Sequence, residues 1–285
     1  MRLVLMPPAS EMEVFTEPKI DSHVHVLDPQ RFPYNPNTHY APAGQELGTP
    51  AQLTEVMEAY GTRHALLVGP NSGYGLDNRC LLDTIARGGD RFKGIAVVPN
   101  GIAYDELVAL KAAGVIGVAW NATFYGVDYY EDAAPLVDKL VDLDMFVDIQ
   151  VEHAQLLAFM PMLEKTNVRI LVDHAGRPTV DEGIGQPGFR ALLDLAATRR
   201  AYIKLSGFVK YSREPSPHDD VRPFLDALRD AYTPEHCLWA SDWPYLRAPA
   251  RVDYGVQLGV AQRLFPDARE RRAFMYDNAK RLFGF

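Results

Sequence analysis

The chain has 285 residues, of which 47% are hydrophobic and 23% are charged, and its formal net charge is −8. This size and composition predict one globular domain, residues 1–285, with a large core. The acidic balance, without a Lys/Arg cluster, argues against a nucleic-acid partner. The sequence has no apolar run of about 18 residues, so it predicts no membrane span. The apolar run within residues 1–11 is too short for a signal-peptide core. We therefore expect a cytoplasmic enzyme with no membrane partner.

Short apolar runs recur along the chain and predict eight strands, at residues 20–27, 64–69, 94–98, 116–120, 145–151, 168–173, 202–205 and 237–240. Amphipathic patterns predict helices between them, at residues 49–60, 78–87, 104–113, 133–143, 155–164, 189–198, 223–230 and 268–282. Strands that alternate with helices in this way predict an α/β fold of the (β/α)8 TIM-barrel type. A doubly wound sheet has the same alternation, but the first strand lacks the GxGxxG turn that such a sheet uses to bind dinucleotides.

Polar residues stand where most of these strands end, and active sites of barrels lie at that end. They are His23, His25, Asn71, Ser72, Asn121, Gln150, His174, Ser206 and Asp242. Three segments, residues 29–50, 209–221 and 244–252, read as long loops over the same face, where loops commonly bind substrate. Cys80 and Cys237 are too few for a disulfide framework and lack CxxC spacing, so we expect two reduced core thiols.

The pair His23 and His25 is the strongest chemical feature of the sequence. Residues two apart on a strand point to the same face, so both imidazoles should enter one cavity while Val24 and Val26 pack outward. His174 ends the sixth apolar run, and Asp242 adds a carboxylate at the matching point of the eighth. Three imidazoles and one carboxylate suit either a metal site or a site that activates water.

With these residues in view, the chain resembles the amidohydrolase superfamily, and within it amidohydrolase family 2 and the metal-independent lactonases typified by pyrone dicarboxylate lactonase. The resemblance covers residue 20 to the C-terminus and rests on these motifs: Asp-Ser-His-Val-His at 21–25, Arg-Phe-Pro-Tyr-Asn-Pro at 31–36 with Tyr40 after it, Gly-Ile-Ala-Val-Val at 94–98, Val-Asp-His-Ala-Gly-Arg-Pro at 172–178 and Ala-Ser-Asp-Trp-Pro at 240–244. It implies a TIM barrel of the amidohydrolase type and a lactonase of aromatic catabolism that opens a cyclic ester.

By this resemblance, Asp242 holds the hydrolytic water and acts as general base, while His23, His25 and His174 polarise the carbonyl. Metal-dependent members usually carry a histidine at the end of strand five, where this chain has Gln150, and a neutral amide binds zinc poorly. We therefore expect no essential metal. A bound zinc or manganese would use His23, His25 and Asp242, with His174 a further candidate, and His153 is the residue that could reach back toward Gln150.

Substrate recognition departs from the family pattern. By the resemblance, Ala119 and Tyr125 stand where the pyrone dicarboxylate enzyme has two arginines that bind carboxylates, so a different lactone, with one carboxylate or none, is expected. Arg177 remains as a partner for one carboxylate, its alternative being an ordinary ion pair at the barrel rim. The other candidate substrate contacts are Tyr40, Ser72, Gln150, Asn121, Tyr125 and Trp243. Lys210, Tyr211 and Arg213 form a second, weaker candidate anion site.

The remaining expectations concern side chains outside the catalytic set, the partners and the rival functions. Strand alternation should turn Asp148 and Asp173 outward into structural ion pairs. No catalytic role is expected for His39, His64, His218 or His236. The expected partner is a small-molecule lactone. A homo-oligomer is compatible with the sequence, which does not decide the oligomeric state. The rival functions are a metal-dependent decarboxylase or other amidohydrolase acting on an aromatic acid, which Gln150 disfavours, and a catalytically silent barrel that binds a ligand.

Overall fold

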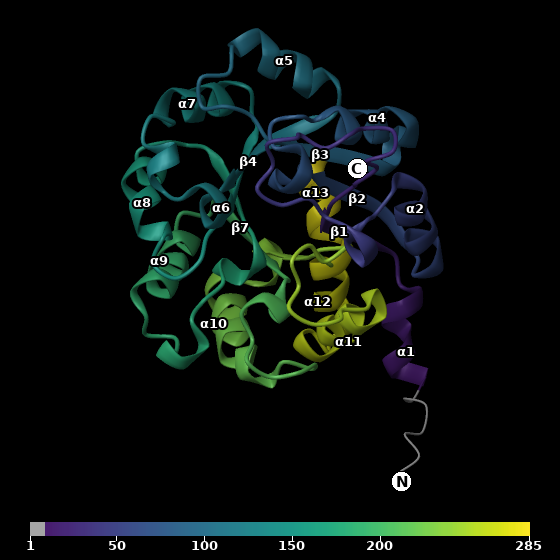
Figure 1. Ribbon diagram of the computed structural model, residues 1–285. Coiled ribbons are helices and arrows are strands. Elements are labelled where there is room, and N and C mark those ends of the chain that lie inside the picture. The colour runs from purple at the N-terminus through teal and green to yellow at the C-terminus, as the bar shows by residue number, and fades with distance from the viewer. Residues whose placement is uncertain (1–8) are drawn as a thin grey trace.

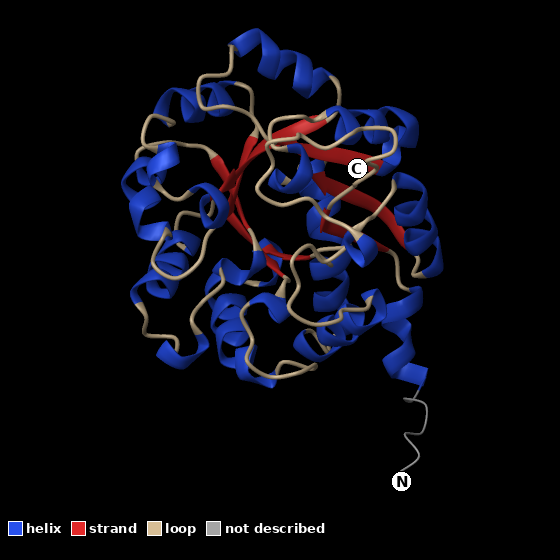
Figure 2. Ribbon diagram, in the orientation of Figure 1, coloured by secondary structure: helices blue, strands red, loops and turns tan. Residues whose placement is uncertain are grey.

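Eight parallel strands form one sheet in sequence order, β1 to β8, and helices surround it (Figures 1 and 2). The computed structural model describes residues 9–285, and the short apolar run at the N-terminus falls largely on residues 1–8, outside the described residues. The strands are β1 Lys19–Val24, β2 Thr62–Val68, β3 Phe92–Ala96, β4 Val115–Asn121, β5 Phe146–Gln150, β6 Arg169–Val172, β7 Ala201–Leu205 and β8 Cys237–Trp239. All eight predicted strands and the predicted TIM barrel are confirmed.

The helices form the outer layer of the barrel, as Figure 2 shows in blue. They are α1 Ala9–Thr16, α2 Pro50–Ala59, α3 Asn71–Tyr74, α4 Arg79–Gly88, α5 Tyr104–Ala112, α6 Ala122–Tyr125, α7 Ala134–Asp142, α8 Leu156–Glu164, α9 Pro187–Ala196, α10 Arg222–Tyr232, α11 Tyr254–Leu264, α12 Ala268–Arg272 and α13 Asn278–Phe283. The sequence did not predict α1, α3, α6 or α11. The predicted helix 268–282 is interrupted by a π-helical turn, Ala273–Asp277.

Two apolar layers hold the barrel together. The larger one lies between strands and helices and contains Val24 and Val26, which point away from the barrel interior as predicted. The smaller one fills the barrel at the end where the strands begin, and there Ile20 and Phe146 pack with Phe283 of α13. Cys80 and Cys237 are buried and unpaired, as expected. Across residues 9–285, none of the helices has both the length and the apolar character that a membrane crossing requires.

The sheet closes between β1 and the segment that follows β8. Val24 and Trp243 form a parallel bridge, the His25 amide donates to the Trp243 carbonyl at 2.8 Å, and the Asp242 amide donates to the His23 carbonyl at 3.0 Å. The buried Asp21 carboxylate fixes this closure from below, since its Oδ1 accepts from the Ser241 amide at 2.9 Å. The two ends of the chain therefore meet beside His23 and Asp242.

Candidate active site

The closure between β1 and β8 places the first three site residues. The pairing of β1 with β2 shifts register between Asp21 and Val24, and after this irregularity both His23 and His25 line the cavity at the mouth of the barrel. Asp242 follows β8 with φ +66, a left-handed conformation that is uncommon for a residue with a side chain. Strained backbone of this kind clusters at functional sites, because the surrounding structure holds it in place.

A second strained turn brings in His174. The chain leaves β6 at Val172 and turns through four consecutive residues with positive φ, from His174 to Arg177. The His174 side chain is completely buried, and its Nδ1 lies 3.0 Å from the Ser206 hydroxyl at the end of β7. Gly207 makes this contact sterically feasible, since a Cβ on that residue would lie 2.7 Å from His174 Nδ1.

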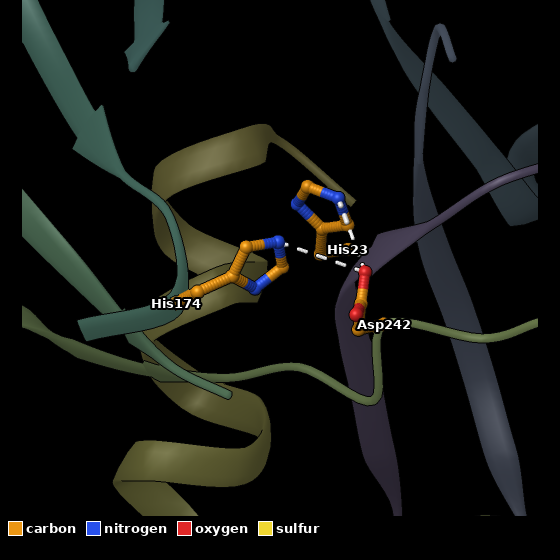
Figure 3. A group of neighbouring side chains, drawn as sticks. All are labelled: His23, His174 and Asp242. Carbon is orange, nitrogen blue, oxygen red and sulfur yellow. Dashed lines mark ion pairs between the residues drawn. The ribbon is translucent and has the colours of Figure 1, made fainter. Parts of the chain in front are cut away.

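The three imidazoles converge on one oxygen of Asp242. Oδ1 lies 3.6 Å from His174 Nε2, 3.8 Å from His25 Nε2 and 3.9 Å from His23 Nε2. Figure 3 shows the His23 and His174 rings directed at this carboxylate, from β1 and from the turn after β6. Neither Asp242 Oδ1 nor His174 Nε2 has a hydrogen-bond partner among the described residues, although both atoms are buried. These atoms therefore surround a point at which a small ligand can be bound from several sides.

The partners of the other ring nitrogens set the hydrogen-bonding character of the imidazoles. His25 Nδ1 donates to the Val68 carbonyl at 2.8 Å, and His23 Nδ1 donates to the Asp173 carboxylate at 3.0 Å. In the neutral rings the Nε2 atoms of His23 and His25, 3.2 Å apart, are consequently both acceptors. A hydroxyl can donate or accept, so Ser206 allows a neutral His174 to present Nε2–H to the cavity.

A buried network of charges lies beneath the imidazoles, and the sequence analysis missed its cation. Lys204 of β7 is completely buried, and its Nζ lies 2.7 Å from Asp148 Oδ2 and 2.9 Å from Asp173 Oδ1. The expectation that Asp148 and Asp173 point outward was wrong, because both line the cavity. Asp148 shares the inward parity of Phe146 and Gln150 on β5, and Asp173, in extended backbone just after β6, continues the inward parity of Leu171. Their predicted structural pairing is confirmed. A lysine within the apolar run 202–205 was the available signal.

Burial and neighbouring charges shift the pKa of each ionisable group at the centre. Burial lowers the pKa of His23 and His174, and lowers that of His25 to about 3. Burial acts in the opposite direction on the pKa of Asp242, but the Lys210 ammonium beside the carboxylate holds it below its usual range. Asp242 is therefore ionised and the imidazoles of the free site are neutral at pH 7.

His23 and His25 line a cavity of about 420 Å³, whereas His174 and Asp242 are buried beside them and are not part of its lining. Among the predicted substrate contacts, Arg177, Ser72, Asn121 and Gln150 line it, whereas Tyr40, Tyr125 and Trp243 are not part of its lining. The Tyr40 hydroxyl instead donates to Glu46, Tyr125 stacks on Tyr129, and Trp243 faces a neighbouring cavity. We keep only the four lining residues as proposed substrate contacts.

One wall of the cavity is an amide network. Gln150 Nε2 donates to Asn121 Oδ1 at 3.1 Å and to the Thr123 hydroxyl at 2.6 Å, while Asn121 Nδ2 donates to Asn71 Oδ1 at 3.0 Å. His153 does not join it, because its Nδ1 contacts the Thr179 hydroxyl at 2.8 Å on the surface. This wall, which includes Gln150 at the end of β5, offers neutral hydrogen-bonding groups and no cation.

The cations of the cavity lie elsewhere. Arg177 is directed into the cavity and forms no ion pair within the described part of the chain, which removes its alternative interpretation as a rim ion pair. The three residues of the weaker candidate anion site do not form one site. Lys210 Nζ contacts Asp242 Oδ2 at 2.5 Å, and Arg213 pairs with Asp181 on the surface. The Tyr211 hydroxyl is buried and has no hydrogen-bond partner among the described residues. The carboxylate of Asp242 is thus held by Lys210 through one oxygen, and the other faces the imidazoles.

The donor set would also fit a divalent metal. His23, His174 and Asp242 each offer a ligand atom within 4.8 Å of the others, and the His25 Nε2 atom adjoins them. Neutral imidazoles whose Nδ1 atoms are held by other groups are the usual form of histidine ligands. The geometry thus allows a metal at His23, His25, His174 and Asp242, but the Lys210 ammonium already occupies one side of the carboxylate.

Comparison with known proteins agrees with the fold and the site. A family model described as "Amidohydrolase" matches residues 20–285, and the chain therefore belongs to this amidohydrolase family. It is 30% identical over 276 residues to a 4-sulfomuconolactone hydrolase of Rhizobium radiobacter, covering 93% of this chain and 89% of the relative. It is 26% identical over 277 residues to a 2-pyrone-4,6-dicarboxylate hydrolase of Comamonas testosteroni, with 93% and 89% covered.

A solved structure gives the same assignment. It is described as that of a probable 2-pyrone-4,6-dicarboxylic acid hydrolase of Acinetobacter baumannii with citric acid bound. The two chains share 27% sequence identity with a TM-score of 0.86, and the match covers 94% of this chain and 99% of the other. The resemblance inferred from the sequence motifs is confirmed.

The buried network predicts a large loss of stability when its cation is removed. Lys204→Met leaves two buried carboxylates without their ammonium, and we expect the free energy of unfolding to fall by about 3–5 kcal/mol. Adding Asp148→Asn to this variant removes one of the unpaired charges and should restore part of the loss. Urea unfolding of the single and double variants measures both effects. A loss below about 1 kcal/mol for Lys204→Met would contradict the network.

Two glycines with the same φ of +66 separate backbone strain from contact with His174. Gly183→Ala meets no atom within 4 Å, so it should cost only about 1–2 kcal/mol of left-handed strain. Gly207→Ala carries the same strain and also forces the His174 ring to move, which adds about 1–3 kcal/mol. Denaturant unfolding of both variants tests this, and equal losses would show that Gly207 does not govern the His174 position.

The low pKa of His25 predicts how stability depends on pH. The folded state keeps this imidazole neutral down to pH of about 3, whereas the unfolded chain takes up a proton near pH 6.5. Stability is therefore lost as pH falls below 6.5, by about 1 kcal/mol per pH unit for this group. In chelator-treated protein, His25→Gln should make the fall in unfolding free energy between pH 6 and pH 4 shallower by that amount. An unchanged slope would count against a buried neutral ring.

Proposed function

We propose that this protein is a hydrolase that opens a lactone or related cyclic ester, without an essential metal. The observation that carries the proposal is the convergence of three imidazole Nε2 atoms on the ionised, unpartnered Oδ1 of Asp242, at a cavity large enough for a small ring. The names of two curated relatives, a 4-sulfomuconolactone hydrolase and a 2-pyrone-4,6-dicarboxylate hydrolase, support this class of substrate.

In the proposed reaction Asp242 is the general base. A water molecule donates one hydrogen bond to Asp242 Oδ1 and loses that proton as its oxygen forms a bond to the lactone carbonyl carbon. The resulting tetrahedral oxyanion then breaks the bond between this carbon and the ring oxygen. The ring oxygen takes the proton back from Asp242, so the product is a hydroxy acid or its keto tautomer, and the carboxylate is regenerated.

The imidazoles stabilise the oxyanion in this proposal. A neutral His174 can donate from Nε2 directly, at a cost of roughly 10²–10³ in rate if such a donor is removed. His23 or His25 can donate from Nε2 only when its ring takes up a second proton, and the Asp173 carboxylate that accepts from His23 Nδ1 balances that charge. Because burial lowers the pKa of both rings in the free site, we place this additional proton in the complex with an anionic substrate or oxyanion.

A divalent metal, if bound by His23, His25, His174 and Asp242, would supply Lewis-acid activation of the carbonyl or water. The proposed reaction does not pass through such an ion, because Asp242 and His174 supply the base and a donor. The rival function, a metal-dependent decarboxylase or other amidohydrolase acting on an aromatic acid, needs a complete metal site.

The substrate we propose carries one anionic group. Arg177 is a half-buried cavity cation with no ion-pair partner among the described residues, and a bidentate pair with a carboxylate or sulfonate suits its guanidinium. Arg247 also lines the cavity outside any ion pair of the described residues, but it is exposed. Lys210 is occupied by Asp242, and the wall formed by Asn121 and Gln150 is neutral. A second carboxylate would therefore be buried against amides, which is unfavourable.

Asp242→Asn tests the general base. We expect kcat for lactone hydrolysis to fall by roughly 10²–10⁴-fold, because the amide has no basic oxygen, while ligand affinity and fold are retained. The assay uses pyrone carboxylates, muconolactones and sugar lactones with protein shown to be metal-free by elemental analysis. Asp253→Asn, a surface carboxylate paired with Arg251, is the matched control and should keep wild-type kcat.

The outcomes of this assay separate the candidate functions. Turnover that disappears with chelation and returns with zinc or manganese would contradict a metal-free reaction. No turnover of any lactone under either condition would favour the decarboxylase. If the wild type and Asp242→Asn bind a ligand equally well and neither turns it over, a silent barrel would be favoured.

Arg177→Met tests the single-anion substrate. The KM for an anionic lactone should rise about 10–100-fold with the loss of a charge-assisted pair, while the KM for an uncharged lactone should stay unchanged. Arg213→Met removes a cation from an exposed surface pair and serves as control. An equal increase of KM for charged and uncharged lactones would contradict recognition of the anion by Arg177.

A further inference from the structure

Three of the four groups that surround the reaction centre present acceptors to one another and need a positive charge among them. His23 Nε2 and His25 Nε2 are both acceptors in the neutral rings and lie 3.2 Å apart, and the anionic Asp242 Oδ1 lies 3.8–3.9 Å from them. Acceptors that face one another at such distances repel unless a cation or proton lies among them. With His174, they also make the four-ligand set of nitrogen and oxygen atoms that zinc prefers.

Lys210 is the cation placed against this set. It ends the 3-10 turn Phe208–Lys210, which begins after Gly207 and is anchored by the buried Phe208 side chain. Its side chain is only 10% exposed, it lines the cavity, and its Nζ lies 2.5 Å from Asp242 Oδ2. The ammonium thus reaches the reacting carboxylate from a largely buried position.

A metal at the centre would have to share the Asp242 carboxylate with this ammonium. One oxygen would face the ion and the other would face Lys210 Nζ, so two cations would lie within one carboxylate of each other. Their repulsion is strong in a buried site, because the surroundings screen it weakly. Displacing Lys210 would instead leave a buried ammonium without its partner, which is also costly.

We propose that Lys210 excludes divalent metal from this centre. Its ammonium takes the place of a divalent ion beside Asp242 and prevents the histidines from retaining one. The inference deepens the proposed function and rests on its metal-free reaction. It assigns to Lys210 a positioning role, in which Oδ2 is held by the ammonium while Oδ1 stays directed at the water.

The test measures zinc affinity, which needs no substrate. Wild type, Lys210→Met and Lys210→Arg are stripped of metal and titrated with zinc in competition with a chromophoric chelator. Lys210→Met frees the carboxylate and removes the opposing charge, so its zinc Kd should fall at least about tenfold, whereas Lys210→Arg should stay within about threefold of wild type. Arg247→Met removes another cavity-lining cation that does not contact Asp242 and should also stay within threefold.

Equal zinc affinity in wild type and Lys210→Met would overturn the inference. A gain in zinc affinity in Arg247→Met equal to that in Lys210→Met would also overturn it, because it would show a general effect of net charge. Adding Asp242→Ala to Lys210→Met should abolish the gain, and a gain that persists would place the zinc elsewhere and overturn it too. Circular dichroism checks the fold, and Lys210→Gln replaces Lys210→Met if the latter unfolds. Since the titration involves no lactone, a failure of lactone turnover would count against the proposed function and leave the zinc result to decide the role of Lys210.

Discussion

The site depends on the closure of the barrel between β1 and the segment after β8. Two backbone hydrogen bonds, from Asp242 to His23 and from His25 to Trp243, join residues more than 200 positions apart in the sequence. They fix the spacing between Asp242, the proposed general base, and His23 and His25. Asp21 supports this closure with a buried carboxylate, so the same short stretch of β1 carries both the structural and the chemical residues.

Charge is arranged in two layers at this centre. The lower layer pairs Lys204 with Asp148 and Asp173, and Asp173 in turn holds the His23 ring. The upper layer pairs Lys210 with Asp242. Each layer places a buried lysine beside carboxylates that would otherwise be costly to bury. The imidazoles lie between the layers, with the His23 ring held by the lower one, and their Nε2 atoms face Asp242 Oδ1.

The sequence predicts the fold well because its signals are local. Continuous apolar runs mark each strand, and the catalytic candidates stand where those runs end. Other features depend on three-dimensional context. The left-handed turn brings His174 inward against the alternation expected from Ile170 and Val172, and Lys204 was overlooked inside an apolar run. Tyr40, Tyr125 and Trp243 belong to loops or short helices whose path over the barrel has no periodic signal, so their exclusion from the cavity required the structure.

A crystal structure of Asp242→Asn with an anionic lactone, grown from metal-free protein, tests the account most directly. We predict the lactone carbonyl oxygen within hydrogen-bond distance of His174 Nε2, its carbonyl carbon facing residue 242, and its anionic group on Arg177. A lactone bound with its carbonyl directed away from the histidines, or bound only when a metal ion bridges the imidazoles and the carbonyl, would contradict the account.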